Sequence, residues 1–325
     1  MRICIYGAGA IGGYLGFLLQ AAGSAVTLID QGAHQAAIAR NGLTLHMNDE
    51  TRTLAMTCTD DPSTLPVQDL LFIAVKTYAI ADILPQLAGL LGPNSVVVNL
   101  NNGIPWWYFH ADPAAPPAPH LNCVDPGGRQ WAVLDPARAI GCVVYPACKL
   151  VEPGVIQHVS GNRFALGEPS GEKTERVNAL AALLRNCGLK AAVKTRIRDE
   201  VWIKLWGNMA FNPISVLTGA TLAQICANTA TRQLARELML EARNVAQALG
   251  VKFSISEEQR IDGAAGVGEH KTSMLQDYEA GLPLETDALL GVVQELGGIT
   301  GIATPVVDHI AALLALKCNV GARAS

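Results

Sequence analysis

A glycine-rich segment near the N-terminus constrains the fold more than any other feature of the sequence. Residues 7–12 read Gly-Ala-Gly-Ala-Ile-Gly, between the apolar run Arg2–Tyr6 and the helical pattern Ile11–Ala22. In a strand-GxGxxG-helix unit the glycines allow a tight turn, close approach of a pyrophosphate and close helix packing, and the helix N-terminus offers N–H groups to phosphates. The position of the motif between a strand pattern and a helix pattern favours such a unit over an ordinary turn. It predicts a dinucleotide-binding loop made of Gly7, Ala8, Gly9, Ala10, Ile11 and Gly12.

Further strand and helix patterns alternate up to about residue 195, which predicts strand-helix-strand units around a parallel sheet. The expected strands are Arg2–Tyr6, Ala25–Ile29, Leu70–Val75, Ser95–Leu100, Arg163–Gly167 and Lys190–Val193. The expected helices among them are Ile11–Ala22, Ala79–Leu91 and Glu172–Cys187. We therefore expect residues 1–195 to form a Rossmann-like, doubly wound α/β domain that binds a dinucleotide.

After residue 195 only helical periods occur, separated by turn signals such as Asn212-Pro213 and Gly297-Gly298. The expected helices are Asp199–Phe211, Leu222–Leu249, Ser256–Val267, Leu284–Leu296 and Val306–Cys318. The sequence thus predicts an all-helical domain over residues 196–325, and a cleft between the two domains.

Residues 104–136 interrupt this pattern. They carry seven prolines, the pair Gly127-Gly128 and aromatic residues that include Trp106, Trp107, Tyr108 and Trp131. Proline fixes the backbone and lacks an N–H donor, so we expect a loop or insertion here and no sheet core. The aromatic residues leave two alternatives open, an ordered lid or interface and a passive surface excursion.

Asp30 ends the second expected strand, about twenty residues after the glycines. In this place an acidic residue usually binds the adenosine ribose and repels a 2′-phosphate, which favours NAD. Gln31 follows, and the nearest basic residue is Arg40. Local residue chemistry alone therefore points to NAD.

Two further groups of polar residues lie in the helical half. Lys204, Asn208 and Asn212 follow one another at steps of four, so they share one face of a helix beside apolar residues. A lysine ammonium can protonate a carbonyl oxygen, and asparagine amides can orient a substrate; a solvated stripe is the alternative. The second group is Ser273-Met274-Leu275-Gln276-Asp277 with the later Glu285, which read alone could be caps and exposed acids.

Composition excludes several other classes of protein. A formal net charge of -4 gives no electrostatic case for nucleic acid or anionic lipid. We expect neither a secretory leader nor a membrane-spanning segment, because the chain starts directly with a strand pattern and no apolar run is long enough to span a bilayer. The eight cysteines show no pairing pattern and the seven histidines no metal-ligand spacing, so we expect reduced thiols, a cytoplasmic location and no metal.

Taken together, these groups resemble the ketopantoate reductase (2-dehydropantoate 2-reductase) family, nearly end to end. The family's glycine motif matches Gly7, Gly9 and Gly12, its lysine after a buried strand matches Lys76, and its later Asn-Gly matches Asn102-Gly103. Its catalytic lysine with two asparagines matches Lys204, Asn208 and Asn212. Its Ser-Met-Leu-Gln-Asp segment and later glutamate match residues 273–277 and Glu285.

The resemblance implies a helical domain like that of 6-phosphogluconate dehydrogenase, an NADPH cofactor and reduction of a small 2-oxo acid. The most specific reaction it implies is reduction of 2-dehydropantoate to (R)-pantoate in pantothenate biosynthesis. Lys204 would be the general acid. Substrate binding would fall to Lys76, Asn102, Asn208, Asn212, Ser273 and Glu285. Asp30, Lys76, Asn102 and Glu285 would join the glycine loop in binding the cofactor, and the helical domain could also serve in a homodimer.

Two departures from the family pattern keep alternatives open. Asp30-Gln31 stands where the family commonly has an arginine for the 2′-phosphate, so NAD is an alternative cofactor to NADP. The insertion after Asn102-Gly103 could reshape the pocket for a 2-oxo acid other than ketopantoate. The 3-hydroxy acid dehydrogenases, which also join a Rossmann domain to helices, are the rival enzyme class. A dinucleotide-sensing protein without catalysis is the non-enzyme alternative, against which the retained Lys204 argues.

Overall fold

The computed structural model describes residues 1–113, 115–117 and 120–321. The chain divides into two compact units. The first unit comprises Met1–Asn101, Pro105–His120 and Gly127–Ile197, and the second comprises Asn102–Ile104, Leu121–Pro126 and the chain from Arg198 onwards. Of the sequence predictions, Pro119 in the insertion and residues 322–325 of the helical half lie outside the described residues.

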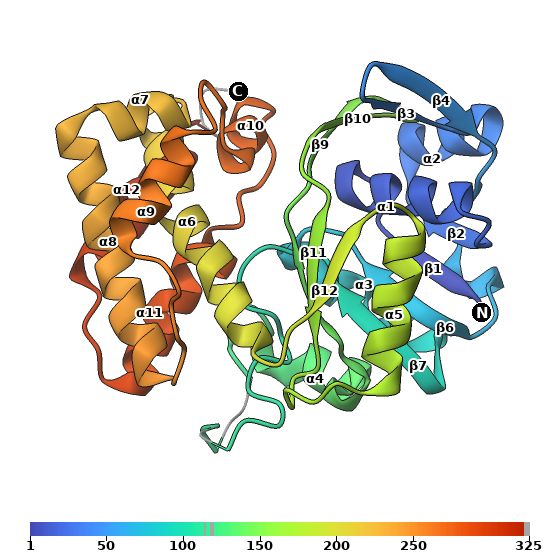
Figure 1. Cartoon of the computed structure of the whole chain (residues 1–325), viewed down its shortest axis with the longest axis horizontal. Coiled ribbons are helices and arrows are strands. Elements are labelled where there is room, and N and C mark those ends of the chain that lie inside the picture. Colours follow the sequence, from blue (N-terminus) through green and yellow to red (C-terminus); the bar gives the residue numbers. More distant parts are fainter. Residues whose placement is uncertain (114, 118–119, 322–325) are drawn as a thin grey trace. The chain divides into compact units, whose positions relative to one another are not determined.

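A parallel five-stranded sheet forms the centre of the first unit (Figure 1). Its strand order is β5-β2-β1-β6-β7, with β1 paired to β2 on one side and β6 on the other. The strands are β1 (Ile3–Tyr6), β2 (Val26–Ile29), β5 (Thr57–Thr59), β6 (Gln68–Ile73) and β7 (Leu91–Asn99). The apolar side chains of β1 and β6 are almost fully buried because helices or further strands cover both faces. The predicted doubly wound α/β fold is confirmed.

Helix α1 (Ala10–Ala21) follows the glycine loop and packs against β1 and β2. Gly16 makes this close packing possible, because a Cβ there would lie 2.7 Å from the Leu28 side chain. The other helices that connect these strands are α2 (Gly32–Asn41) and α3 (Ile80–Gly89). Helix α2, which the sequence analysis missed, carries little apolar periodicity and buries only His34 and Ile38.

A second sheet, of order β4-β3-β10-β9, packs on the other side of α1. It was not predicted. Its strands are β3 (Leu43–Met47), β4 (Glu50–Leu54), β9 (Ala147–Glu152) and β10 (Val155–Ser160). Strand β4 is almost entirely exposed, so it lacks the apolar run that marks the central strands. The overlooked signal was Asn48-Asp49, whose positive φ angles of 52° and 63° form the two-residue hairpin turn that joins β3 and β4.

A third sheet contains the two short strands expected late in the first unit. Its order is β12-β11-β8, with β8 (Gly141–Val144), β11 (Arg163–Gly167) and β12 (Lys190–Val193). Helix α5 (Glu175–Asn186) connects β11 to β12 and begins at Thr174, whose side chain accepts the Val177 N–H. Its apolar face joins the hydrophobic core that the three sheets share.

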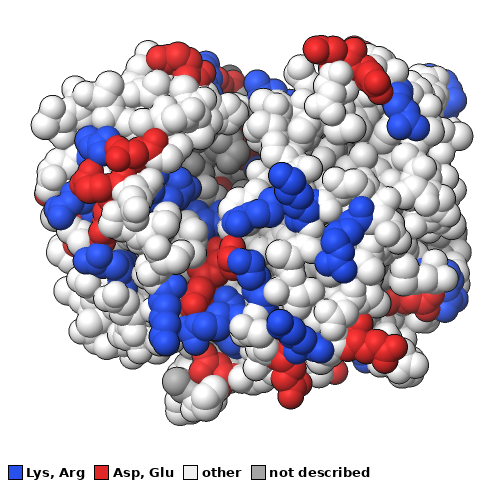
Figure 2. Space-filling model, in the orientation of Figure 1, with Lys and Arg blue, Asp and Glu red and all other residues white. Residues whose placement is uncertain are grey.

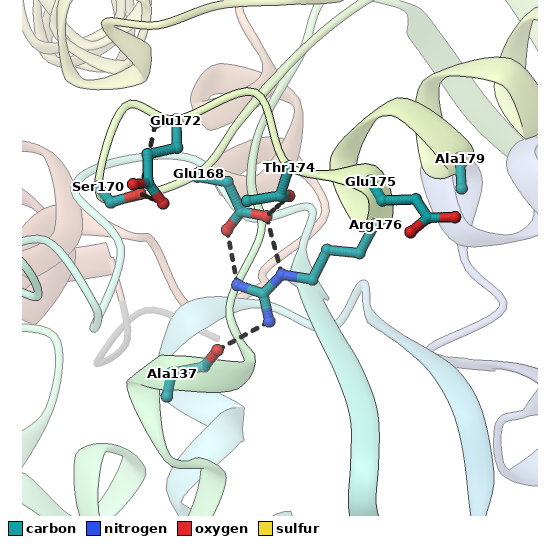
Figure 3. A pocket seen from close by; sticks show the side chains of 8 residues that line it. All are labelled: Ala137, Glu168, Ser170, Glu172, Thr174, Glu175, Arg176 and Ala179. Carbon is teal, nitrogen blue, oxygen red and sulfur yellow. Dashed lines mark hydrogen bonds and ion pairs between the residues drawn. The ribbon is translucent and has the colours of Figure 1, made fainter.

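A buried ion pair holds the start of α5 to the rest of the unit (Figure 3). Glu168 is 2% exposed and accepts hydrogen bonds from Arg176 Nε at 2.8 Å and Nη2 at 2.6 Å. Thr174 Oγ1 also donates to it, and Arg176 donates in turn to the carbonyls of Ala137 and Ala139. The pocket in Figure 3 is thus lined by groups that already satisfy one another, which indicates a structural role.

The proline-rich insertion is packed into the first unit through its aromatic residues. Trp106, Trp107, Tyr108 and Phe109 are each at most 2% exposed. The Trp107 ring lies against Gly141, where a Cβ would be 2.8 Å from the ring. Short helices α4 (Arg129–Leu134), η3 (Pro126–Gly128) and η4 (Pro136–Arg138) end the insertion. These contacts exclude a passive surface excursion for this segment.

The second unit is helical apart from its connecting segments (Figure 1). Its helices are α6 (Ile197–Thr218), α7 (Leu222–Ala227), α8 (Thr229–Ala248), α9 (Glu257–Ala265), α10 (Ser273–Glu279), the π-turn η5 (Asp287–Gly291), α11 (Val292–Thr300) and α12 (Pro305–Gly321). Helix α8 is the centre of this packing, with contacts to α7, α9, α11 and α12.

Three predicted helix boundaries were wrong. Helix α6 continues through Pro213, because Phe211, Ile214 and Val216 are buried and their packing outweighs the backbone hydrogen bond that proline removes. The expected helix Leu222–Leu249 is two helices, divided at Asn228, whose side chain accepts the first N–H groups of α8.

The third wrong boundary is Gly297-Gly298, where the sequence predicts a turn; both residues lie inside α11. Gly297 is needed for packing, because a Cβ there would be 2.8 Å from the Ile302 carbonyl oxygen. Helix α11 ends instead at Gly301, which adopts a left-handed conformation with φ of 72°.

Charged residues join α8 to α9 on the outside of the second unit. Arg232 pairs with both Glu258 and Asp262 at 2.7 Å, and Arg236 pairs with Glu258 at 3.3 Å. Figure 2 shows basic and acidic side chains interspersed on this face of the molecule. Because each basic residue of this group has acidic neighbours, the ladder holds two helices together and offers no single-sign surface to a ligand.

Candidate functional site

The glycine loop between β1 and α1 has the geometry that its sequence predicts. Gly7 has φ of 100°, and a Cβ on it would lie 2.9 Å from the backbone of Ala74. A Cβ on Gly12 would lie 1.9 Å from the Gly7 carbonyl oxygen. Both positions therefore require glycine, the first for its backbone conformation and the second for space.

Gly9, unlike Gly7 and Gly12, has open space around its Cα. It is the N-cap of α1, with φ of -59° and ψ of -165°, and a Cβ there would meet no atom within 4 Å. Neither conformation nor protein packing therefore requires glycine at this position. Open space beside the N-terminus of a twelve-residue helix fits the pyrophosphate of a dinucleotide, which approaches the backbone at this glycine.

Asp30 lies at the carboxyl end of β2, half-buried and turned towards this loop. Its Oδ2 accepts the Ala8 N–H at 2.7 Å, and its Oδ1 accepts the Gln31 N–H at 2.8 Å. The carboxylate thus binds the glycine loop itself, which the sequence had not indicated.

Acidic residues also follow the neighbouring strand. Asp60 and Asp61 come directly after β5, which pairs with β2 up to Ile29 and Thr59, and the Asp30 N–H donates to the Thr59 carbonyl. Burial raises the pKa of the Cys58 thiol to about 12, and the charges of Asp30 and Asp60 contribute. Asp60 and Asp61 line a pocket with Pro85 and Gln86 of α3. This corner of the sheet is therefore acidic, a feature that the sequence analysis did not recognise.

A chain of asparagines holds the ends of β6 and β7 together. The Trp106 indole donates to Asn99 Oδ1 at 2.7 Å, and Asn99 donates to Asn101 Oδ1 at 3.1 Å. Asn101 in turn donates to the carbonyl of Val75. Lys76 follows Val75 and is half-buried. Sequence reasoning missed Asn99 and Asn101, although the Asn-Leu-Asn-Asn run was a visible signal.

Asn102 and Gly103 continue the chain into the second unit. Gly103 has φ of 87°, and a Cβ on it would lie 2.2 Å from the Ala288 carbonyl oxygen. Glu285 is 8% exposed and lies three residues before Ala288, just ahead of the helix. The structure therefore brings the predicted Asn102 and Glu285 segments together, and glycine is required where they meet.

Helix α6 presents the three polar residues in its middle. Lys204 and Asn208 are half-buried, and Asn212 is only 5% exposed. Their neighbours Leu205 and Met209 are fully buried. The alternative of a fully solvated stripe is therefore wrong.

Ser273 is the first residue of α10 and is exposed, while Thr272 acts as the N-cap by accepting the Leu275 N–H. Met274 and Leu275 are buried and fix this helix in the second unit. The sequence leaves helix capping open as a role for this cluster. In the structure Thr272 is the cap. Ser273 itself faces outwards from the helix start.

Within residues 1–113, 115–117 and 120–321, no helix is long and apolar enough to cross a membrane. Over the same part of the chain, no three His, Cys, Asp or Glu side chains gather in a group suited to a metal ion.

The parallel sheet and its glycine loop define the class of dinucleotide-binding α/β proteins. Comparison with known sequences narrows this class. The family described as "Ketopantoate reductase PanE/ApbA" matches residues 3–171, and its C-terminal domain matches residues 196–317. A 2-dehydropantoate 2-reductase of Mesorhizobium japonicum is 49% identical over 97% of both chains. The chain belongs to the ketopantoate reductase family.

Solved structures agree with this assignment. A Ralstonia solanacearum protein, assigned as a ketopantoate reductase, is 39% identical and superposes with a TM-score of 0.93 over 98% of both chains. The 2-dehydropantoate 2-reductase of Geobacter metallireducens is 29% identical, with a TM-score of 0.86 over 97% of this chain and 99% of that one. The relatives thus span the whole length of this chain.

Proposed function

We propose that this protein reduces 2-dehydropantoate to (R)-pantoate with NADPH, in pantothenate biosynthesis. The observation that carries the proposal is the Lys204-Asn208-Asn212 face of α6, held among buried side chains in a chain that is 49% identical to a named 2-dehydropantoate 2-reductase. A structural helix face beside tryptophans would have no need for an ammonium and two amides.

Lys204 serves as the general acid. A lysine ammonium normally has a pKa of about 10.4, so a lysine can donate a proton to the C2 carbonyl oxygen at neutral pH. When bound, NADPH would supply the hydride for C2. The products are the alcohol and the oxidised cofactor, and Lys204 regains its proton from solvent.

The remaining predicted residues orient the two ligands. Asn208, Asn212 and Ser273 offer amides and a hydroxyl to the substrate, and Lys76, Asn102 and Glu285 serve both substrate and cofactor. The contact of Gly103 with Ala288 supports a shared role for Asn102 and Glu285, because it keeps their segments adjacent. Positioning of this kind lowers the barrier by removing the entropy cost of bringing the reactants together.

In this proposal the first unit holds most of the cofactor, and the second unit provides the substrate residues other than Lys76. Open space at Gly9 and the N-terminus of α1 suit the pyrophosphate. For the 2′-phosphate, the bonds from Ala8 and Gln31 to Asp30 support NADPH, because they engage both carboxylate oxygens. The negative charges of Asp60 and Asp61 oppose binding of a 2′-phosphate. We therefore expect a weaker preference for NADPH over NADH than an arginine at position 31 would give.

The test is Lys204→Ala, with Lys204→Arg as its partner. Loss of a general acid costs roughly 10²–10⁴-fold in turnover, while NADPH binding to the first unit should remain. Arginine keeps the charge but, with its high pKa, is a poor proton donor, so it should restore substrate binding more than turnover. Turnover of Lys204→Ala near that of the unmodified protein would remove Lys204 from the mechanism.

We also propose that the protein is a cytoplasmic homodimer. None of the eight cysteines, all of which lie in the described part of the chain, forms a disulfide, which suits a reducing compartment. On α12, Leu313, Leu316 and Val320 are more than half exposed at spacings of three and four, which forms an apolar stripe suited to a second copy. Leu316→Glu should convert dimers to monomers in analytical ultracentrifugation, and an unchanged dimer would place the interface elsewhere.

A further inference from the structure

His34 lies in the first turn of α2 and makes two hydrogen bonds to backbone groups far away in the sequence. It is 9% exposed. Its Nε2 lies 2.9 Å from the Ala8 carbonyl oxygen in the glycine loop. Its Nδ1 lies 2.9 Å from the backbone nitrogen of Gly154, in the turn between β9 and β10. The ring thus joins the glycine loop to the second sheet.

These two partners determine the tautomer of the ring. A backbone N–H can only donate, so His34 Nδ1 accepts from Gly154 and carries no proton. A carbonyl oxygen can only accept, so Nε2 carries the proton and donates it to Ala8. His34 is therefore a neutral imidazole with a defined donor and a defined acceptor.

The Gly154 anchor is itself held in place. Its carbonyl oxygen accepts the Thr44 N–H at 2.8 Å, and its φ of 81° is a conformation that glycine adopts easily. A Cβ on Gly154 would lie 3.2 Å from Ala37 Cβ, so the turn also packs closely on α2. Through His34, the turn of the second sheet therefore fixes the position of the glycine loop.

Ala8 is held by side chains on both of its polar groups. Its N–H donates to Asp30 and its carbonyl accepts from His34. In a planar trans peptide the carbonyl and the following N–H point in opposite directions. Because His34 fixes the Ala8 carbonyl, it also directs the Gly9 N–H away from the ring, on the other side of the same peptide.

We propose that His34 is a positioning residue for cofactor binding, which orients the Ala8–Gly9 peptide so that the Gly9 N–H donates to the dinucleotide pyrophosphate. The inference rests on the proposed function only in that the glycine loop binds NADPH. His34 touches neither cofactor nor substrate, and acts through Ala8.

Two substitutions separate the two bonds of the ring. In His34→Gln the side-chain Nε2 can still donate to Ala8, and the bond to Gly154 is lost. In His34→Asn the Oδ1 can still accept from Gly154, and the bond to Ala8 is lost. Each variant removes one buried hydrogen bond, so a merely structural role predicts similar losses of thermal stability and similar cofactor affinity.

We expect His34→Asn to raise the Kd of NADPH roughly tenfold, the worth of one neutral hydrogen bond, and His34→Gln to keep it near that of the unmodified protein. At saturating NADPH, kcat should be nearly equal in all three proteins. Equal Kd values in the two variants, or an unchanged Kd in His34→Asn, would overturn the proposal. Failure of the unmodified protein to bind NADPH would instead overturn the proposed function.

A measurement on the unmodified protein covers the case in which either variant fails to fold. Nitrogen-15 NMR of the histidine rings should show His34 with its proton on Nε2, and addition of NADPH should shift the Gly9 amide strongly. A proton on Nδ1, or a Gly9 amide that does not respond to NADPH, would contradict the positioning role.

Discussion

Gly9→Ala tests whether the glycine loop binds a phosphate or only makes a turn. A Cβ at this position meets no protein atom within 4 Å, and the backbone is at φ of -59°, which alanine adopts without strain. As an N-cap, alanine is less favourable than glycine by less than about 1 kcal/mol. Alanine also restricts the unfolded chain, which stabilises the folded protein by about 0.4–1 kcal/mol and offsets this loss. The free energy of unfolding should therefore hardly change.

Cofactor binding should change much more. Hydrogen bonds to charged groups contribute about 1.5–3 kcal/mol each, and a methyl group in the pyrophosphate space would disrupt at least one or two of them. A loss of about 3 kcal/mol corresponds to roughly 10²-fold in the Kd of NADPH. NADPH fluorescence measures the affinity, and thermal denaturation measures the stability.

Two other glycines serve as controls for this experiment. Gly89→Ala, at the end of α3, also meets no atom within 4 Å and should change neither quantity. Gly12→Ala places its Cβ 1.9 Å from the Gly7 carbonyl oxygen, so it should lose about 1–3 kcal/mol of stability together with cofactor binding. If stable Gly9→Ala binds NADPH as tightly as the unmodified protein, the loop is only a turn and the reasoning fails.

Three further predictions concern cofactor choice, stability and pH. Asp30→Asn should raise kcat/KM with NADPH if its carboxylate faces the 2′-phosphate, and our account, in which both oxygens are held by Ala8 and Gln31, predicts a change of less than about tenfold. Arg176→Ala leaves Glu168 buried without its ion pair and should destabilise the protein by about 3 kcal/mol in urea denaturation, the lower end of the usual range because Arg176 is 38% exposed; no change would show that Glu168 is solvated. Burial raises the pKa of Cys4 to about 12, so between pH 9 and 12 the unfolded chain loses this proton first and stability falls as pH rises. In that window Cys4→Ala should show a pH slope shallower by up to about 1.4 kcal/mol per unit, and equal slopes would contradict the assigned pKa.

The sequence predicts four of the five central strands, because they leave continuous apolar runs such as Leu70 to Ile73. It misses β5 (Thr57–Thr59), which is short, partly exposed and without an apolar run. It misses the second sheet, because strands such as Glu50–Leu54 are exposed and have no such run. It misplaces the end of α6, because burial of Ile214 and Val216 is a tertiary effect that local signals at Pro213 cannot reveal.

In the candidate site too, local sequence patterns predict some features, and others depend on tertiary contacts. Spacing alone places Lys204, Asn208 and Asn212 on one face, since a helix fixes that relation. Spacing cannot show that Asp30 and His34 bind the two sides of Ala8, or that Gly103 lies against Ala288. Those contacts join segments that are distant in the sequence, and they depend on how loops are directed by the fold.

The most direct test of the proposed function is the initial rate at which the unmodified protein oxidises NADPH with 2-dehydropantoate, followed by the absorbance of the reduced nicotinamide. The same assay with NADH and with other 2-oxo and 3-hydroxy acids provides the comparison. We predict that 2-dehydropantoate with NADPH gives the highest kcat/KM of the set. A value at least tenfold higher, about 1.4 kcal/mol, for another acid or for NADH would contradict the proposed substrate or cofactor, and binding of NADPH without turnover of any acid would indicate a sensor.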